Sequence, residues 1–110
     1  MIMLDFLAFR RPNTASKELK TGLRFRIAPD VKASLHSQGI VLINLTRGTV
    51  FSANRAGAII WNGAVERWSL DRIAKSISNE FHIPAQSAHD DTAEFVAQLA
   101  AEGLLVPDAN

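Results

Sequence analysis

The chain has 110 residues, which suits one domain, and 47% of them are apolar, enough for a real hydrophobic core. It contains no cysteine, which excludes a disulfide framework, a thiolate nucleophile and a cysteine metal site, and which fits a cytoplasmic protein. Twelve basic and eleven acidic residues give a net charge of +1, a weaker basic bias than a duplex-binding module usually shows.

The N-terminal segment differs in composition from the rest of the chain. Residues 1–9 are apolar apart from Asp5, and positive charges follow them, which is the reverse of a secretory signal. The run is also too short to span a bilayer. Residues 10–22 are polar and contain Pro, Asn, Ser and Gly, as a linker does. We therefore expect a tail and linker over 1–22, a domain over 23–107 and a C-terminal tail over 108–110.

Three segments after the linker have the patterns expected of β-strands. Residues 23–30 place apolar side chains on one side and arginines on the other, and they end at a Pro-Asp pair. Residues 31–37 alternate less regularly and lead to a turn at 38–39. Residues 40–45 are apolar on both faces apart from Asn44, which predicts the central strand of a small sheet.

A hairpin and a capped helix are expected next. Residues 46–48 form a three-residue loop with glycine where a positive φ is needed, and residues 49–53 return antiparallel. Asn54 is a preferred N-cap for the apolar helix that follows. Gly57 inside this helix costs about 1 kcal/mol relative to alanine, which a close approach of another element would offset. Trp61 has the bulk to anchor the core.

Two further helices complete the predicted domain. Ser69 caps a helix over 70–81, whose apolar side chains recur on one face. Pro84 suits the first position of the last helix, which runs to about Glu102 and is closed by Gly103. Its inner stripe is Ala88, Thr92, Phe95, Val96 and Leu99. The order of elements predicts an α+β fold, with helices on one face of a three- or four-stranded antiparallel sheet.

The sequence shows no constellation of reactive side chains. His36, His82 and His89 are not spaced as metal ligands, and the motifs of phosphate, dinucleotide and acyl chemistry are missing. Asp90 and Asp91 would point about 100° apart on a helix, so they do not converge on one substrate atom. We therefore expect no metal, no cofactor and no catalytic residue, and a binding module rather than an enzyme.

The surface used for binding has more than one interpretation. The strand over 49–53 carries no charge, proline or bulge, so it can accept a further strand if 40–45 is central. The alternative is that the last helix or the N-terminal tail covers this edge. The first helices can also be read as part of a winged-helix DNA-binding regulator, although 70–81 presents only Arg72 and Lys75 outward.

Residues 40–105 resemble the PqqD-like family of peptide-binding modules, also called RiPP recognition elements. The matching stretches are "IVLINLTRG", "TVFSAN", Gly57, Ile60–Trp61, "SLDRIAKSISNEF", Asp91, Phe95, Leu99 and Gly103–Leu104–Leu105. The departures are Arg55 and Ala53, which stands where the family usually has a large aliphatic residue. The tail and linker lie outside the resemblance.

The resemblance implies a winged-helix-like domain that binds the leader part of a ribosomally made precursor peptide without catalysis. In this family the leader adds as a strand to the third strand of the sheet and is clamped by the third helix. Carried over, the peptide-binding residues are Thr49, Val50, Phe51, Ser52, Ala53, Asp91, Glu94, Phe95, Gln98 and Ala101.

The resemblance also implies a maturation enzyme as the second partner. A transglutaminase-like cysteine protease of lasso-peptide maturation is favoured, and a radical SAM enzyme comes next. No nucleic-acid or membrane partner is expected. The apolar tail offers a route to a homodimer, because it can occupy the same edge strand of a neighbouring chain.

Overall fold

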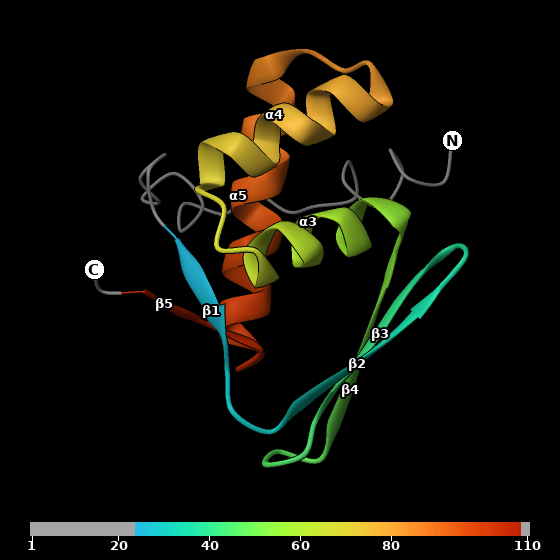
Figure 1. Cartoon of the computed structure of the whole chain (residues 1–110), viewed down its shortest axis with the longest axis vertical. Helices are drawn as coiled ribbons and strands as arrows, with labels where there is room; N and C mark the ends of the chain where they lie inside the picture. Colours follow the sequence, from blue (N-terminus) through green and yellow to red (C-terminus); the bar gives the residue numbers. More distant parts are fainter. Residues whose placement is uncertain (1–23, 109–110) are drawn as a thin grey trace.

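Two small antiparallel sheets and three helices make up the fold, which confirms the predicted α+β class. The structure is a computed structural model that describes residues 24–108 (Figure 1), so the expected tail and linker lie outside the described residues. Within this range no helix combines the length and the apolar character needed to cross a membrane. In chain order the elements are β1 (Phe25–Ile27), β2 (Val31–His36), β3 (Gly39–Asn44), β4 (Thr49–Asn54), α3 (Arg55–Val65), α4 (Leu70–Phe81), α5 (Ala85–Ala101) and β5 (Leu105–Pro107).

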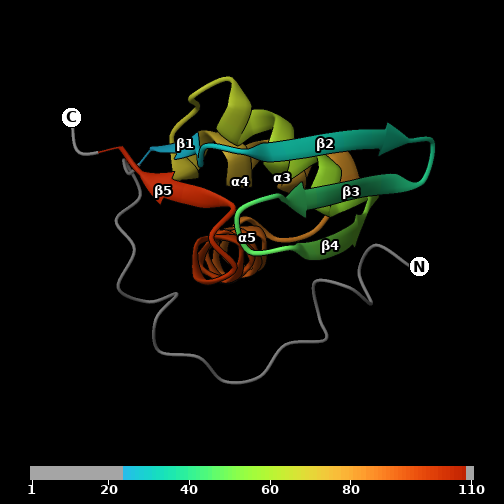
Figure 2. The ribbon, with the colours of Figure 1, turned by 90° about the horizontal axis from the view of Figure 1, so that it is seen from below.

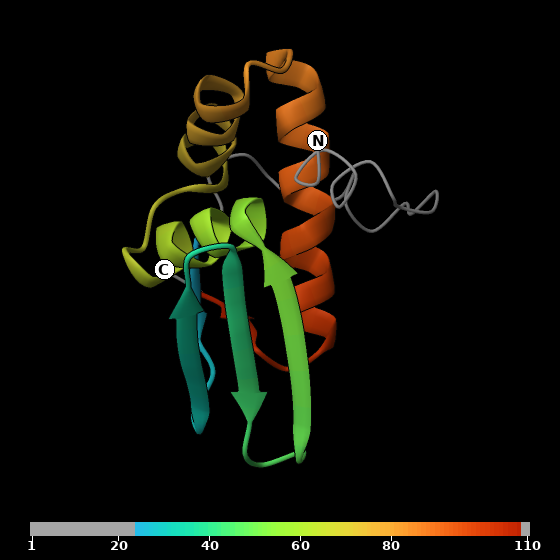
Figure 3. The same ribbon diagram turned by 90° about the vertical axis from the view of Figure 1, so that its right-hand side faces the viewer.

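The main sheet has β3 between β2 and β4, as the sequence predicted. Ile40 and Leu42 of β3 belong to the core and are 2% and 1% exposed. Ala53 pairs with Ile40 and Phe51 with Leu42, so β4 directs both side chains to the same inner face. Helix α3 crosses behind this sheet, and α5 runs beside β4 (Figure 3).

The loop between β3 and β4 is longer than predicted. Strand β3 ends at Asn44, so the loop is Leu45–Gly48 rather than residues 46–48. The Gly48 N–H closes this loop by donating to the Asn44 carbonyl oxygen at 2.8 Å. Gly48 has a φ of +69°, which confirms the predicted positive φ.

The first strand does not join the main sheet. It pairs antiparallel with β5, Phe25 lying opposite Pro107, and the two form a separate sheet (Figure 2). The C-terminal segment packs onto the domain, because Leu104 and Leu105 are each 1% exposed. Its pairing as a strand was not predicted. The main sheet is accordingly three-stranded.

Both predicted side-chain caps are confirmed. Asn54 Oδ1 accepts the Gly57 N–H at 3.4 Å, and Ser69 Oγ accepts the Arg72 N–H at 3.2 Å. Each cap satisfies a main-chain donor that the first turn of a helix leaves unpaired. Trp61, the seventh residue of α3, is 4% exposed and anchors the core as expected.

Helix α5 begins one residue later than predicted. Pro84 is its N-cap rather than its first residue, because its ψ of 146° is extended and its carbonyl oxygen accepts the Ala88 N–H at 2.9 Å. The C-terminal end matches the prediction. Gly103 has a φ of +75°, and the Leu104 N–H donates to the Leu99 carbonyl oxygen at 2.9 Å, a Schellman closure. The predicted inner stripe is buried at Ala88, Thr92, Phe95, Val96 and Leu99.

Gly57 allows α3 to approach β4 closely. A Cβ at this position would stand 2.4 Å from the Ala53 Cβ, which is too near for a methyl group, and 3.0 Å from the Phe95 Cζ, which is a tight contact. The expected close approach at Gly57 is therefore confirmed. Ala53 belongs to the same contact, so a larger side chain at position 53 would meet α3.

Replacing Gly57 with alanine tests this contact. At an unobstructed helix position the change would raise the free energy of unfolding by about 1 kcal/mol. Because the added methyl group meets Ala53, we expect a decrease of about 1–3 kcal/mol instead, measured by urea denaturation. Asn62→Ala, at an exposed position of the same helix, is the matched control and should cause no decrease. A gain in stability from Gly57→Ala would contradict the tight contact.

Candidate functional site

Strand β4 is an edge strand of the main sheet. Among residues 24–108, β3 is the only strand that pairs with it, and β2 forms the opposite edge. The run Thr49–Ala53 has no charged residue and no proline, the usual features that block an edge from pairing. The side of β4 away from β3 is the side next to α5 (Figure 3).

The side chains of β4 alternate between two environments. Phe51 and Ala53 are half-buried on the inner face, whereas Ser52 is exposed and Val50 is 67% exposed on the outer face. Thr49, at the start of the strand, is exposed. Val50 and Ser52 therefore direct their side chains away from the helices, and any contribution they make next to α5 comes from their main chain.

The five candidate residues of α5 lie on one stripe of that helix, because their spacings of three and four residues return to the same face. Asp91 and Phe95 are 7% and 3% exposed, so the stripe has a buried part. Glu94 is half-buried, and Gln98 and Ala101 are exposed towards the C-terminal end. The stripe thus passes from the core to the surface along the helix.

The two rows of residues meet at an aromatic contact. The ring centroids of Phe51 and Phe95 are 6.0 Å apart with an interplanar angle of 46°, a tilted arrangement that aromatic pairs favour. The Phe95 ring also lies close to Gly57 at the start of α3, where a Cβ would stand 3.0 Å from its Cζ. The structure therefore brings Phe51 and Phe95 together and holds α5 next to β4 at this point.

A second junction between β4 and α5 was not singled out from the sequence. Arg47, in the loop before β4, donates from Nη1 to the Ala101 carbonyl oxygen at 3.2 Å. Asn44 at the end of β3 donates from Nδ2 to the Gly103 carbonyl oxygen at 3.1 Å, and its Oδ1 accepts the Arg47 N–H at 3.0 Å. A loop arginine carries no periodicity, so only the buried asparagine in an apolar strand marked this place in the sequence.

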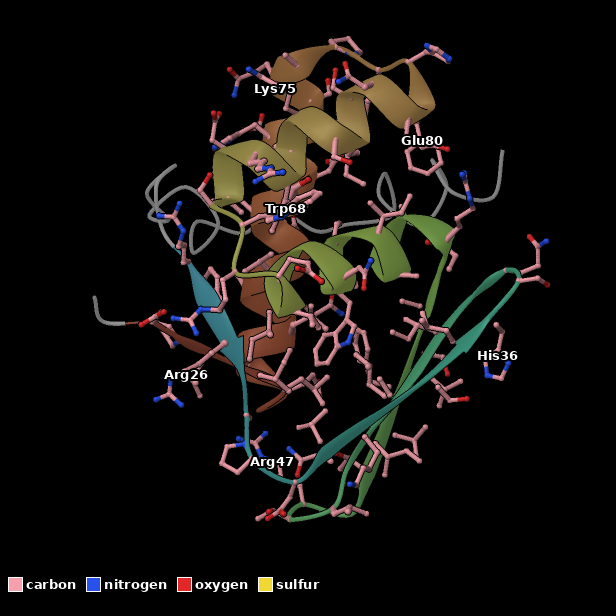
Figure 4. All side chains as sticks on the ribbon, viewed as in Figure 1. Arg26, His36, Arg47, Trp68, Lys75 and Glu80 are labelled. Atoms are coloured by element: carbon pink, nitrogen blue, oxygen red, sulfur yellow. The ribbon has the colours of Figure 1, made fainter. Side chains whose placement is uncertain are left out.

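Other charged side chains of the helices contact neighbours within the fold. Arg55 pairs with Glu80, and its guanidinium lies 5.4 Å from the centroid of the Phe81 ring. Arg72 stacks on Trp68, with its Cζ 4.0 Å from the ring centroid; Figure 4 labels Trp68 at the turn before α4. In the described part of the chain no three His, Asp or Glu side chains gather as metal ligands would.

These features define an α+β module with an exposed sheet edge beside a helix. The family model described as "Coenzyme PQQ synthesis protein D (PqqD)" matches residues 39–105, more than half of the chain. The chain therefore belongs to the PqqD family.

Two solved structures share the fold. One is described as "TbiB1 in Complex with the TbiA(beta) Leader Peptide": it is 26% identical with a TM-score of 0.71, and the alignment covers 77% of this chain and 99% of that chain. The other is "Lasso peptide synthetase B1 complexed with the leader peptide", 24% identical with a TM-score of 0.70, covering 76% of this chain and 99% of that chain. No curated protein matches the sequence.

Alanine substitutions in β4 test the alternation along the strand. Phe51→Ala removes the contact with Phe95, and we expect the free energy of unfolding to fall by about 2 kcal/mol, somewhat less than for a fully buried phenylalanine. Val50→Ala, on the exposed outer face, should change it by less than about 0.5 kcal/mol. Thermal and urea denaturation measure both. An equal loss of free energy of unfolding in both variants would contradict the placement of Phe51 on the inner face and Val50 on the outer face.

Proposed function

We propose that this chain is a non-catalytic module that binds the leader segment of a ribosomally made precursor peptide. The leader adds as a strand to β4 and is presented to a separate maturation enzyme. The observation that carries the proposal is the unblocked edge of β4 next to α5 in a chain of the PqqD family. The two structures of similar fold, both with a leader peptide, support it.

Strand addition assigns one role to the main chain of β4 and another to the α5 stripe. A peptide strand lies about 4.8 Å from its neighbour, so main-chain hydrogen bonds to β4 set its register. Its side chains alternate, and those on the inner face meet the stripe of α5. There Phe95 and Phe51 supply apolar surface, and Gln98 and Ala101 lie at the exposed end. The proposed leader site is Thr49, Val50, Phe51, Ser52, Ala53, Asp91, Glu94, Phe95, Gln98 and Ala101.

The module acts by raising the effective concentration of the precursor at the enzyme, which needs no catalytic group of its own. We favour a transglutaminase-like cysteine protease of lasso-peptide maturation as the enzyme, because one similar structure is a lasso peptide synthetase B1. A radical SAM enzyme is the next choice. The cysteine-free composition is in keeping with work in the cytoplasm. A DNA-binding role has weaker support, because Arg72 and Arg55 both contact neighbours within the fold.

A proline in β4 tests the proposed strand addition. Ser52→Pro removes a main-chain donor, and with it we expect the affinity for the cognate leader peptide to be lost; a search for a short precursor gene near this one identifies that peptide. Fluorescence anisotropy with a labelled synthetic leader measures this, and the wild type should bind in the micromolar range or tighter. The thermal transition should persist, because Ser52 is exposed and outside the core.

Two matched variants complete that experiment. Ser52→Ala keeps the main-chain donor and should bind like the wild type. Ala33→Pro places the same defect on β2, the opposite edge strand, and should also leave binding intact. If Ser52→Pro binds the leader normally, or if Ala33→Pro is the variant that loses it, β4 is not the docking edge.

The N-terminal segment generates a separate prediction. If residues 1–9 occupy β4 of a neighbouring chain, the protein is a dimer, and deletion of residues 1–20 should convert it to a monomer and expose the leader site. Multi-angle light scattering of the full chain and the truncated chain measures the mass. A full chain that is already monomeric would exclude this mode of association.

A further inference from the structure

Arg47 forms a bridge across one end of the proposed leader site. It lies in the loop two residues before β4, and its guanidinium donates to the carbonyl oxygen of Ala101, the last residue of α5. The main-chain ends of the strand and the helix are thus linked by a single side chain. Figure 4 labels Arg47 at the end of the hairpin.

The helix end is shaped to receive this guanidinium. A Cβ at Gly103 would stand 2.8 Å from both Cζ and Nε of Arg47, so a side chain at this position would push the guanidinium out of its place. The last carbonyl groups of a helix lack partners within the helix and carry partial negative charge, which favours a cation there. Gly103 therefore has two functions, because it also adopts the positive φ that ends α5.

Asn44 reinforces the same junction from the core side. It is 4% exposed, donates to the Gly103 carbonyl oxygen and accepts the Arg47 N–H, so the loop conformation and the helix end are fixed together. At the other end of the site the Phe51–Phe95 contact sets the separation of strand and helix. The distance between β4 and α5 is therefore fixed at two points, and Arg47 fixes the point nearer the start of β4.

We propose that Arg47 is a positioning residue for leader binding, which holds the C-terminal end of α5 at the distance from β4 that an added strand requires. This inference rests on the proposed function of the β4 edge. An added strand must pair with β4 and at the same time contact Gln98 and Ala101, so both partners have to be in place before it binds. Arg47 acts through Ala101 and the loop rather than by touching the peptide.

The test replaces Arg47 with methionine, which keeps an unbranched stem and removes the donors. Losing a hydrogen bond from an exposed charged group should weaken leader binding about fivefold, measured by anisotropy with the same synthetic leader as the Ser52→Pro experiment. The thermal midpoint should change little, because the buried core is untouched. Arg26→Met, at an exposed position on β1, is the matched control and should bind normally.

A spectroscopic readout separates positioning from direct contact. The chain has no cysteine, so nitroxide labels can be placed at exposed sites through Leu45→Cys and Glu102→Cys, on the two sides of the bridge. In the absence of peptide, dipolar broadening should show one narrow separation in the Arg47 protein and a wider distribution in the Arg47→Met protein. In the unlabelled chain Gly103→Ala should weaken binding as well, and adding Arg47→Met to it should cause little further loss.

The outcomes are distinct. If the Arg47→Met protein shows a wider distribution of label distances but binds the leader with unchanged affinity, the positioning role is wrong. If it binds the leader more weakly but its label distances are unchanged, the positioning role is also wrong, and Arg47 contacts the leader directly. Fully additive losses for Arg47→Met and Gly103→Ala would also overturn it. Failure of the wild type itself to bind the leader would instead show that the proposed function is wrong, whatever the labels report.

Discussion

The position of the Phe95 ring determines how the rest of the molecule can work. The ring lies close to the corner where β4 passes into α3, and it has room there because Gly57 has no side chain. It therefore reaches Phe51 and holds α5 next to the edge of the sheet. These contacts are made by side chains on the inner face of β4. They therefore hold α5 beside the edge of the sheet without occupying the main-chain donors and acceptors of that edge. A site for strand addition needs both conditions, a rigid template strand and a second surface at a fixed distance.

The parts of the fold that depend on local chemistry could be predicted from the sequence. The β3–β4 hairpin follows from alternation and from Gly48, whose φ is positive. Asn54 and Ser69 marked the first turns of α3 and α4, because their side chains satisfy main-chain donors. Gly57 also carried information, since a glycine inside a helix has to be offset by packing. For the candidate site, composition showed only that β4 is unblocked, and the resemblance to the PqqD family supplied the α5 stripe.

The remainder depends on non-local contacts that leave little trace in a sequence. Alternation marked β1 as a strand but not its partner. β5 is too short for a detectable period, and the pairing of Phe25 with Pro107 joins opposite ends of the domain. The start of α5 was misplaced by one residue because proline suits both the N-cap and the first helical position, and only its ψ of 146° distinguishes them. Arg47 was overlooked because its role requires the end of α5 to lie beside the hairpin loop.

The central claim is that the leader pairs with β4, and amide hydrogen exchange with and without the synthetic leader tests it most directly. Bound leader should slow exchange of alternate amides within Thr49–Ala53, because those donors become hydrogen-bonded to the added strand. Amides of β2, the opposite edge, should exchange at the same rate in both states. Unchanged exchange along β4 under saturating leader, or protection confined to β2, would contradict the claim.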